Sequence, residues 1–287
     1  MDYDDIAALA AASAAAAAAI CTVHLVTLAL THSKVDGCSN RKPAERLYSI
    51  RSSQFKVADA NSVYDDGWFH QTLRCTKSSF NTIVDTVTTA WTQVHNNYPA
   101  HNAFFSVRDR VGITLHYLTH SDAIHDSSKI FGMSKTTAWR SIEEVLEVLL
   151  TVIEPTVIYL PTSTVEWHNC ASKFEAVNGF PDACLAVDGT LIEILRPKQY
   201  EGWYCRKGFP AINMQLAVDA RHRIRSYCMR PGSENDSGIY SRSEFGKNIH
   251  KLLPPGCCII ADAGYKLFSH CLVPYNIRTN MPCDKKP

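Results

Sequence analysis

Two aspartates in this sequence each follow a short apolar segment. Asp188 lies in the stretch 184–194 (CLAVDGTLIEI), and Asp262 lies in the stretch 256–265 (GCCIIADAGY). Apolar segments of this length are typical of strands that are buried on both faces of a sheet. A carboxylate beside such a strand is costly to bury unless a partner compensates it, and Mg²⁺ prefers carboxylate and phosphate oxygens as ligands. These residues predict that the two aspartates meet on neighbouring strands and bind a divalent cation.

The same residues also allow an interpretation without any metal. Asp-Gly is the strongest two-residue signal for a β-hairpin, so Asp188-Gly189 would form a tight turn between two strands. The segment 262–264 would then be an ordinary exit from a strand into a loop. The two stretches taken by themselves leave both interpretations open.

Composition limits the class of protein. A chain of 287 residues is long enough for about two domains, each with its own core. The hydrophobic content is 46% and the charged content is 20%. Both values are typical of a soluble globular protein. The net charge of +1 excludes a polycation, so any nucleic-acid site must rest on a local basic surface. The cysteines include no CxxC pair, which argues against structural zinc and favours a reduced intracellular protein.

Residues 1–66 are predicted to be an alanine-rich leader and a linker. The uncharged segment Ile6–Leu30 is long enough to raise the question of a membrane span. Its acidic flank (MDYDD) does not fit a signal peptide, and alanine is only weakly apolar. We therefore expect an alanine-rich helix or low-complexity leader and no membrane association. The polar stretch Ser33–Asp66 is predicted to be a linker leading into a short helix near Ala44–Ser52.

Residues 67–155 are predicted to be an all-helical domain. Trp68–Val94 shows helical spacing with Ser78 or Ser79 as a cap, and three further helices are expected near 106–119, 122–131 and from Ser134 onward. The last two are joined by a turn containing Gly132, which is the pattern of a helix-turn-helix unit. The exposed start of the last helix offers Lys135, Thr136 and Arg140 for contacts with DNA. A plain helical bundle with a solvated basic face is an equally open alternative. His116 and His120 have the spacing of a metal-binding pair, but together with His125 they are expected to be hydrogen-bonded or surface histidines.

Residues 156–287 are predicted to form a mixed α/β domain that begins after a proline-bounded break at 155–161. Strands are expected at 184–194, 211–218, 224–230 and 257–261, with one helix over 238–253. Between Arg196 and Arg230 lie eight basic residues against two acidic ones. Such a stretch, with aromatic residues interleaved, suits a phosphate backbone, although a solvated sheet edge would also explain it.

Four segments together resemble the PIF/Harbinger-type transposase-derived nucleases of the DDE superfamily: AVDGTLIEI (186–194), YCRKGFPAINMQLAVD (204–219), PGSENDSGIY (231–240) and ADAGY (261–265). The helical region from Arg74 onward is also similar to that family. The resemblance implies a ribonuclease-H-like core and a metal-dependent DNA endonuclease or transposase that uses Mg²⁺ or Mn²⁺. By position, Asp188 and Asp262 would be the catalytic acids and metal ligands, and Asp236 a supporting metal ligand. Arg206 and Lys207 would face the DNA backbone.

The resemblance further implies DNA as a partner and a separate DNA-binding partner protein. Together with the scattered cysteines, which fit a reduced intracellular protein, it predicts a nuclear or cytoplasmic location. Two positions depart from the family, where Leu191 and Asn235 each replace a histidine. The third acid, a glutamate on a later helix, is absent from the segment that follows Asp262. We therefore expect a domain that is incomplete at its C-terminus, with activity reduced or lost. The alternative function is a non-catalytic DNA-binding or partner-recruiting relic of a transposase.

Overall fold

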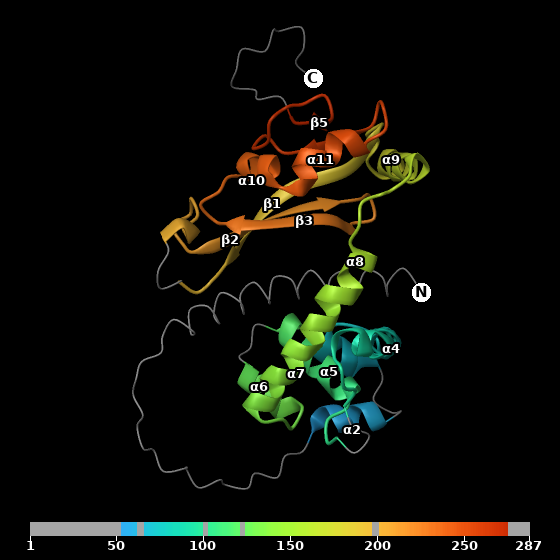
Figure 1. The fold of residues 1–287 in the computed structure, drawn as a ribbon, viewed down its shortest axis with the longest axis vertical. Coiled ribbons are helices and arrows are strands. Elements are labelled where there is room, and N and C mark those ends of the chain that lie inside the picture. The colour runs from blue at the N-terminus through green and yellow to red at the C-terminus, as the bar shows by residue number, and fades with distance from the viewer. Residues whose placement is uncertain (1–52, 62–65, 100–102, 121–123, 197–200, 275–287) are drawn as a thin grey trace. The chain divides into compact units, whose positions relative to one another are not determined.

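A computed structural model describes residues 53–61, 66–99, 103–120, 124–196 and 201–274 of the chain (Figure 1). The chain divides between Val157 and Ile158 into two compact units. The predicted alanine-rich leader and the predicted helix near Ala44–Ser52 lie outside the described residues. None of the described helices is long and apolar enough to cross a membrane.

The first unit is all helical. Its elements are α2 (Gln54–Ala60), α3 (Asp66–Leu73), α4 (Lys77–Val94), α5 (Val107–Thr119), α6 (Ile124–Ile130), α7 (Lys135–Val148), the π-helical turn η1 (Leu149–Ile153) and α8 (Glu154–Val157). The helix α2 lies within the segment predicted as a linker, and it is anchored because Phe55 is buried and stacks on Phe131 at 4.9 Å. Residues 54–60 are therefore part of the folded unit.

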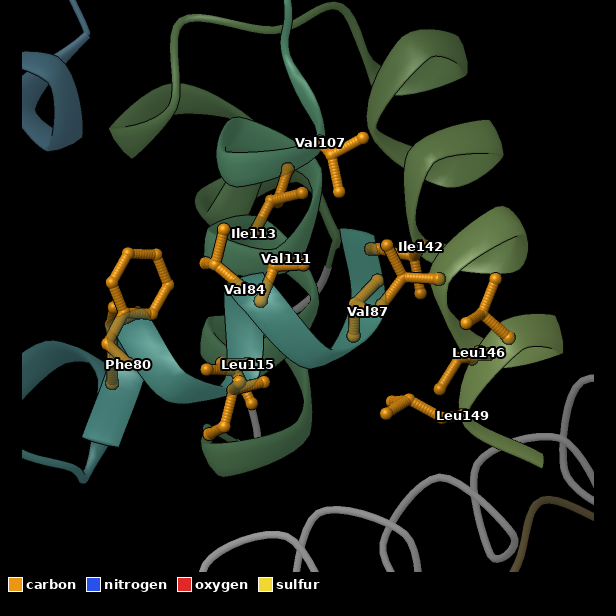
Figure 2. Close-up of a cluster of buried hydrophobic side chains, with 14 of the residues drawn as sticks. Phe80, Val84, Val87, Val107, Val111, Ile113, Leu115, Ile142, Leu146 and Leu149 are labelled. Carbon is orange, nitrogen blue, oxygen red and sulfur yellow. The ribbon is translucent and has the colours of Figure 1, made fainter. Parts of the chain in front are cut away.

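The core of this unit is formed mainly by α4, α5 and α7, which carry apolar residues at three- and four-residue steps. Figure 2 shows side chains from these helices meeting in one cluster, among them Val87, Val111 and Ile142. The predicted cap of α7 is confirmed, because the Ser134 hydroxyl accepts the N–H of Thr137 at 3.1 Å. The predicted caps of α4 are wrong. Ser78 and Ser79 lie inside the helix, and Thr76 is the N-cap.

The helix that follows α7 continues past Pro155, where the sequence predicted a break. Proline lacks a backbone N–H and its ring clashes with the carbonyl four residues earlier. The π-helical turn Leu149–Ile153 lies directly before it and widens the helix there. This local change in helical type lets the chain run on as α8 to Val157.

The second unit is a mixed α/β layer structure. Its elements are α9 (Thr164–Asn178), β1 (Ala183–Glu193), the 3₁₀ turn η2 (Glu201–Trp203), β2 (Ala211–Val218), β3 (Ile224–Pro231), α10 (Asp236–Arg242), α11 (Glu244–Leu252), β4 (Cys258–Ala261) and β5 (Cys271–Leu272). The strand order is β3-β2-β1-β4-β5. The first three strands pair antiparallel, while β4 runs parallel to β1 and β5 parallel to β4. This is the mixed, ribonuclease-H-like sheet that was predicted.

Helices α10 and α11 lie against this sheet (Figure 1), where Tyr240, Phe245 and Ile249 pack with Leu185 and Val187. The single helix predicted over 238–253 is in fact these two helices. The break occurs at Ser243, whose buried hydroxyl donates to the carbonyl of Tyr240 and accepts the N–H of Gly246, both at 2.9 Å. Helix α9 and the short strand β5 were not predicted.

Candidate active site

Asp188 and Asp262 are brought together by the register of two parallel strands. Val187 of β1 pairs with Ala261, the last residue of β4, so an aspartate follows each: Asp188 within β1 and Asp262 directly after β4. Both aspartates line one cavity of about 960 Å³, together with Tyr265 and apolar residues such as Leu267 and Leu272. The two side chains, far apart in the sequence, therefore border the same space.

The hairpin interpretation of Asp188-Gly189 is wrong. Strand β1 continues through both residues, with Asp188 opposite Leu216 and Gly189 opposite Gln215 on β2. The assumption that the two carboxylates are buried is also wrong, because Asp188 and Asp262 are exposed. Because water can solvate both carboxylates, neither carries the cost of a buried unpaired charge. The argument from burial for a cation between them therefore does not hold.

Each of the two carboxylates is oriented by a neighbouring glycine. The N–H of Gly189 donates to Oδ1 of Asp188 at 2.7 Å, and the N–H of Gly264 donates to Oδ1 of Asp262 at 3.0 Å. Within the described residues, no donor contacts Oδ2 of either aspartate. Each carboxylate thus keeps one oxygen for another ligand.

Asp236, at the start of α10, is the third carboxylate of the site. Its Oδ1 accepts a hydrogen bond from Nδ2 of Asn213 at 3.0 Å. Its Oδ2 lies 3.5 Å from the point that a Cβ atom on Gly264 would occupy, and Oδ1 of Asp262 lies 3.1 Å from the same point. Asp236 and Asp262 therefore both lie next to Gly264. The distance between Oδ2 of Asp236 and Oδ1 of Asp262 cannot exceed the sum of 3.5 Å and 3.1 Å.

Tyr265 lies within electrostatic reach of all three carboxylates. Its phenol is buried and accepts a hydrogen bond from Nε2 of Gln215 at 3.1 Å. Burial raises the pKa of the phenol well above its ordinary value, the Gln215 hydrogen bond lowers it, and the negative charges of Asp236, Asp188 and Asp262 raise it further. The phenol is therefore neutral and leaves the negative charge of the site to the aspartates.

The donor set suits a hard divalent cation. Mg²⁺ is commonly held by one or two carboxylates together with phosphate oxygens of a substrate, and Asp188 and Asp262 each offer an oxygen without a hydrogen-bond donor among the described residues. No group of three His, Cys, Asp or Glu side chains in the described ranges is arranged closely enough to hold a metal ion. The residues therefore fit a two-carboxylate site that the substrate completes, with Asp236 as the nearest additional carboxylate.

Arg206 and Lys207 lie in the loop before β2, and both are exposed. They border a second cavity of about 320 Å³, which we call the side cavity and which also includes Asp236 and Asn213. Two other residues of the predicted basic stretch have a structural role instead. Arg223 and Arg225 each contact Oδ2 of the buried Asp219, at 2.8 Å and 3.0 Å.

The predicted DNA-contacting residues Lys135, Thr136 and Arg140 belong to the first unit. All three are exposed in the first two turns of α7. The turn before α7 contains Gly132 with a φ of 64°, a left-handed conformation that favours glycine. His116 is buried with its Nδ1 2.9 Å from Oγ of Ser127, as expected of a structural histidine.

Sequence reasoning missed Asn213, Gln215 and Tyr265. Asn213 and Gln215 alternate along β2 and are almost fully buried, at 5% and 2% exposure. Buried polar side chains on an otherwise apolar strand are unusual and require partners. Asn213 and Gln215 are the two polar residues of the apolar segment AINMQLAV and lie two positions apart, and this spacing was the signal that could have identified them.

Comparison with known proteins supports the assignment of the second unit. Residues 187–286 match the family described as DDE superfamily endonuclease. The chain is also similar to an Arabidopsis thaliana protein named Protein ALP1-like, with 26% identity over 241 residues that cover 76% of this chain. This chain spans 57% of the length of that relative. No solved structure matches the chain significantly. For residues 187–286, the predicted resemblance to DDE superfamily endonucleases is confirmed.

Proposed function

Because residues 187–286 match the DDE superfamily endonucleases, we propose that the second unit is a transposase-derived nuclease that cuts phosphodiester bonds in DNA with Mg²⁺ or Mn²⁺. The observation that carries this proposal is the pairing of Val187 with Ala261 on parallel strands, since Asp188 and Asp262 are the residues that directly follow this pair. Asp188 and Asp262 would hold the cation, and Asp236 would support it.

When bound, a divalent cation in such a site polarises the phosphoryl oxygens and activates the attacking oxygen. The residues of this chain supply the rest. The N–H groups of Gly189 and Gly264 orient the two catalytic carboxylates, so that their Oδ2 atoms remain available. Arg206 and Lys207 are exposed cations that would contact the phosphate backbone of the DNA.

The test is nicking of supercoiled plasmid by the purified full chain in Mn²⁺ and in Mg²⁺. We expect slow nicking that EDTA abolishes and that Asp188→Asn and Asp262→Asn abolish as well. Lys251→Ala, a change at an exposed residue of α11, serves as the matched surface control and should retain activity. Nicking that persists in EDTA would contradict the metal mechanism.

A second function is favoured by a specific observation. The absence of a three-ligand group among the described residues, together with the exposed Lys135, Thr136 and Arg140 on α7, fits a non-catalytic DNA-binding or partner-recruiting role. In this case the first unit would act as a helix-turn-helix module. A salt titration of DNA binding would show log K falling steeply with log[salt] while no nicking occurs.

A nuclease function and a DNA-binding function both place the protein with DNA, and we propose the nucleus as its location. We also propose a separate DNA-binding protein as a partner. The net charge of this chain is only +1, so its own attraction to DNA is limited to local basic surfaces. Fluorescence microscopy of the tagged chain tests the location, and copurification from nuclear extract tests the partner. A signal confined to the cytoplasm would contradict the proposal.

A further inference from the structure

The turn that carries Asp262 is anchored in the core through one side chain. Of residues 262–269, all of which the structure describes, Tyr265 alone is buried, at 5% exposure. Its N–H donates to the carbonyl of Asp262 at 3.2 Å and closes the turn. Inside the turn, the N–H of Gly264 donates to Oδ1 of Asp262 at 3.0 Å. The position of Tyr265 therefore constrains the turn and, with it, the Asp262 carboxylate.

The Tyr265 phenol is itself held by a buried amide from two strands away. Nε2 of Gln215 donates to the hydroxyl oxygen at 3.1 Å, and Gln215 is 2% exposed. Gln215 lies on β2 opposite Gly189 of β1. Tyr265 follows β4, which pairs with the other edge of β1. The hydrogen bond thus spans β1 at the residue that directly follows Asp188, and it links the strand beside Asp188 to the turn of Asp262.

Packing alone does not require this polar pair. The Tyr265 ring lies in an apolar cluster with Val187 and packs edge-on against Tyr240, with ring centres 5.9 Å apart. Two apolar groups of the same shape would fill this place at nearly equal stability. A hydrogen bond adds direction, because it holds one distance and one angle, whereas an apolar contact allows the side chains to slide. The pair therefore fixes the turn more precisely than packing would.

We propose that Gln215 is a positioning residue for the candidate cation site. Through Tyr265 it holds the turn 262–265 at the end of β4, so that the carboxylates of Asp262 and Asp188 face the cavity that both of them line. This inference rests on the proposed function, because the site that Gln215 positions is the one proposed to hold Mg²⁺ or Mn²⁺. It gives a role to a side chain that contacts neither carboxylate.

The first measurement needs no metal. Hydrogen exchange of the full chain in EDTA, read by mass spectrometry on a peptide covering the turn, reports how often the hydrogen bonds of the Gly264 and Tyr265 N–H groups open. Gln215→Met keeps the length of the side chain but removes the donor. We expect these amides to exchange about fivefold to tenfold faster in this variant, as the loss of one buried hydrogen bond would give.

A control variant separates this local effect from a general loss of stability. Asp219→Asn weakens the buried ion pairs to Arg223 and Arg225 in the same unit, away from the turn 262–265. It should lower the resistance of the second unit to urea and leave the exchange of the turn as it is in the wild-type chain. Equal acceleration in Asp219→Asn and Gln215→Met would overturn the positioning role.

The second measurement compares stability with Mn²⁺ affinity, followed by electron paramagnetic resonance. Tyr265→Phe removes the hydroxyl and keeps the ring, while the double variant Gln215→Met/Tyr265→Phe leaves neither polar group without its partner. Each single variant should lose stability against urea and bind Mn²⁺ about tenfold more weakly. The double variant should regain stability but keep the weaker binding, because no hydrogen bond holds the turn.

The outcomes separate this inference from the proposed function. Wild-type exchange of the turn in Gln215→Met, or Mn²⁺ affinity that returns together with stability in the double variant, overturns the positioning role and leaves the nuclease proposal standing. Absence of Mn²⁺ binding by the wild-type chain overturns both.

Discussion

Asp236 Oδ1 lies in the space that a Cβ atom on Gly189 would need. Gly189 is in the middle of β1, where glycine normally weakens a strand. Here its missing side chain admits the carboxylate of Asp236, which Asn213 holds in place from the neighbouring strand. One glycine thus couples the strand that carries Asp188 to the helix that begins with Asp236.

Replacing Gly189 by alanine should therefore displace Asp236. We expect Gly189→Ala to destabilise the second unit by about 1–3 kcal/mol, the usual cost of overpacking a filled site, and to reduce nicking activity. Urea denaturation measures the loss. Gly67→Ala, in α3 of the first unit, is the control for a substitution into open space, because nothing lies within 4 Å of a Cβ atom at that position. A Gly189→Ala variant that is as stable as the wild-type chain would contradict the close contact.

The buried cluster of Asp219 with Arg223 and Arg225 predicts an acid-sensitive second unit. Burial by itself would raise the pKa of Asp219, but the hydrogen bonds and charge of Arg223, followed by the charge of Arg225, outweigh it and hold the pKa below its ordinary value. A lowered pKa in the folded state contributes stability above the unfolded value of about 3.9. That contribution is lost as the pH falls through the lower, folded value.

The variant Asp219→Ala isolates this contribution. It should cost about 3–5 kcal/mol at neutral pH, because it leaves two buried or half-buried arginines without their carboxylate. The drop in stability below about pH 4 should become shallower in the variant. Urea denaturation over a pH series measures both effects, and an unchanged pH dependence would show that Asp219 is not responsible.

DNA binding by the first unit can be tested at the start of α7. We expect Lys135→Ala and Arg140→Ala to weaken binding to all duplexes and each to reduce the slope of log K against log[salt] by about one. The reason is that each exposed cation would replace one counterion on the phosphate backbone. Lys251→Ala on α11 should leave the slope unchanged. If all three variants behave alike, α7 is not a DNA-contacting helix.

The strands of the second unit were the most predictable part of the fold. Strand β2 was predicted with its observed bounds, Ala211–Val218, because its apolar run is bounded on both sides by loop residues. Strand β5 could not be predicted, since a strand as short as Cys271–Leu272 carries no periodicity. The sequence predicted that the strands before Asp188 and Asp262 are neighbours, but it did not predict the full strand order.

Helix α9 was missed although its signals were present. Trp167, Cys170, Ala171 and Phe174 follow helical spacing and are buried. Ser163 caps the helix, and Gly179 ends it in a left-handed conformation. The prolines on either side of this segment favoured a loop, but they lie outside the helix.

The candidate site was predictable in its residues but not in its construction. Asp188 and Asp262 could be selected because each follows an apolar run. The conformation of Asp188-Gly189 could not be decided locally, because Asp-Gly serves equally in a hairpin. Strand β1 continues through Asp188-Gly189 because it stays paired with β2 as far as Glu193, and the missing side chain of Gly189 leaves room for Asp236.

The central claim is that Asp188 and Asp262 hold one divalent cation between them. The most direct measurement is a Mn²⁺ titration of the full chain, followed by electron paramagnetic resonance, for the wild type, Asp188→Asn, Asp262→Asn and the double variant. Shared ligation predicts that each single change lowers the affinity about tenfold or more and that the double change costs little beyond either one. Unchanged affinity in the single variants, or losses that simply add, would contradict it.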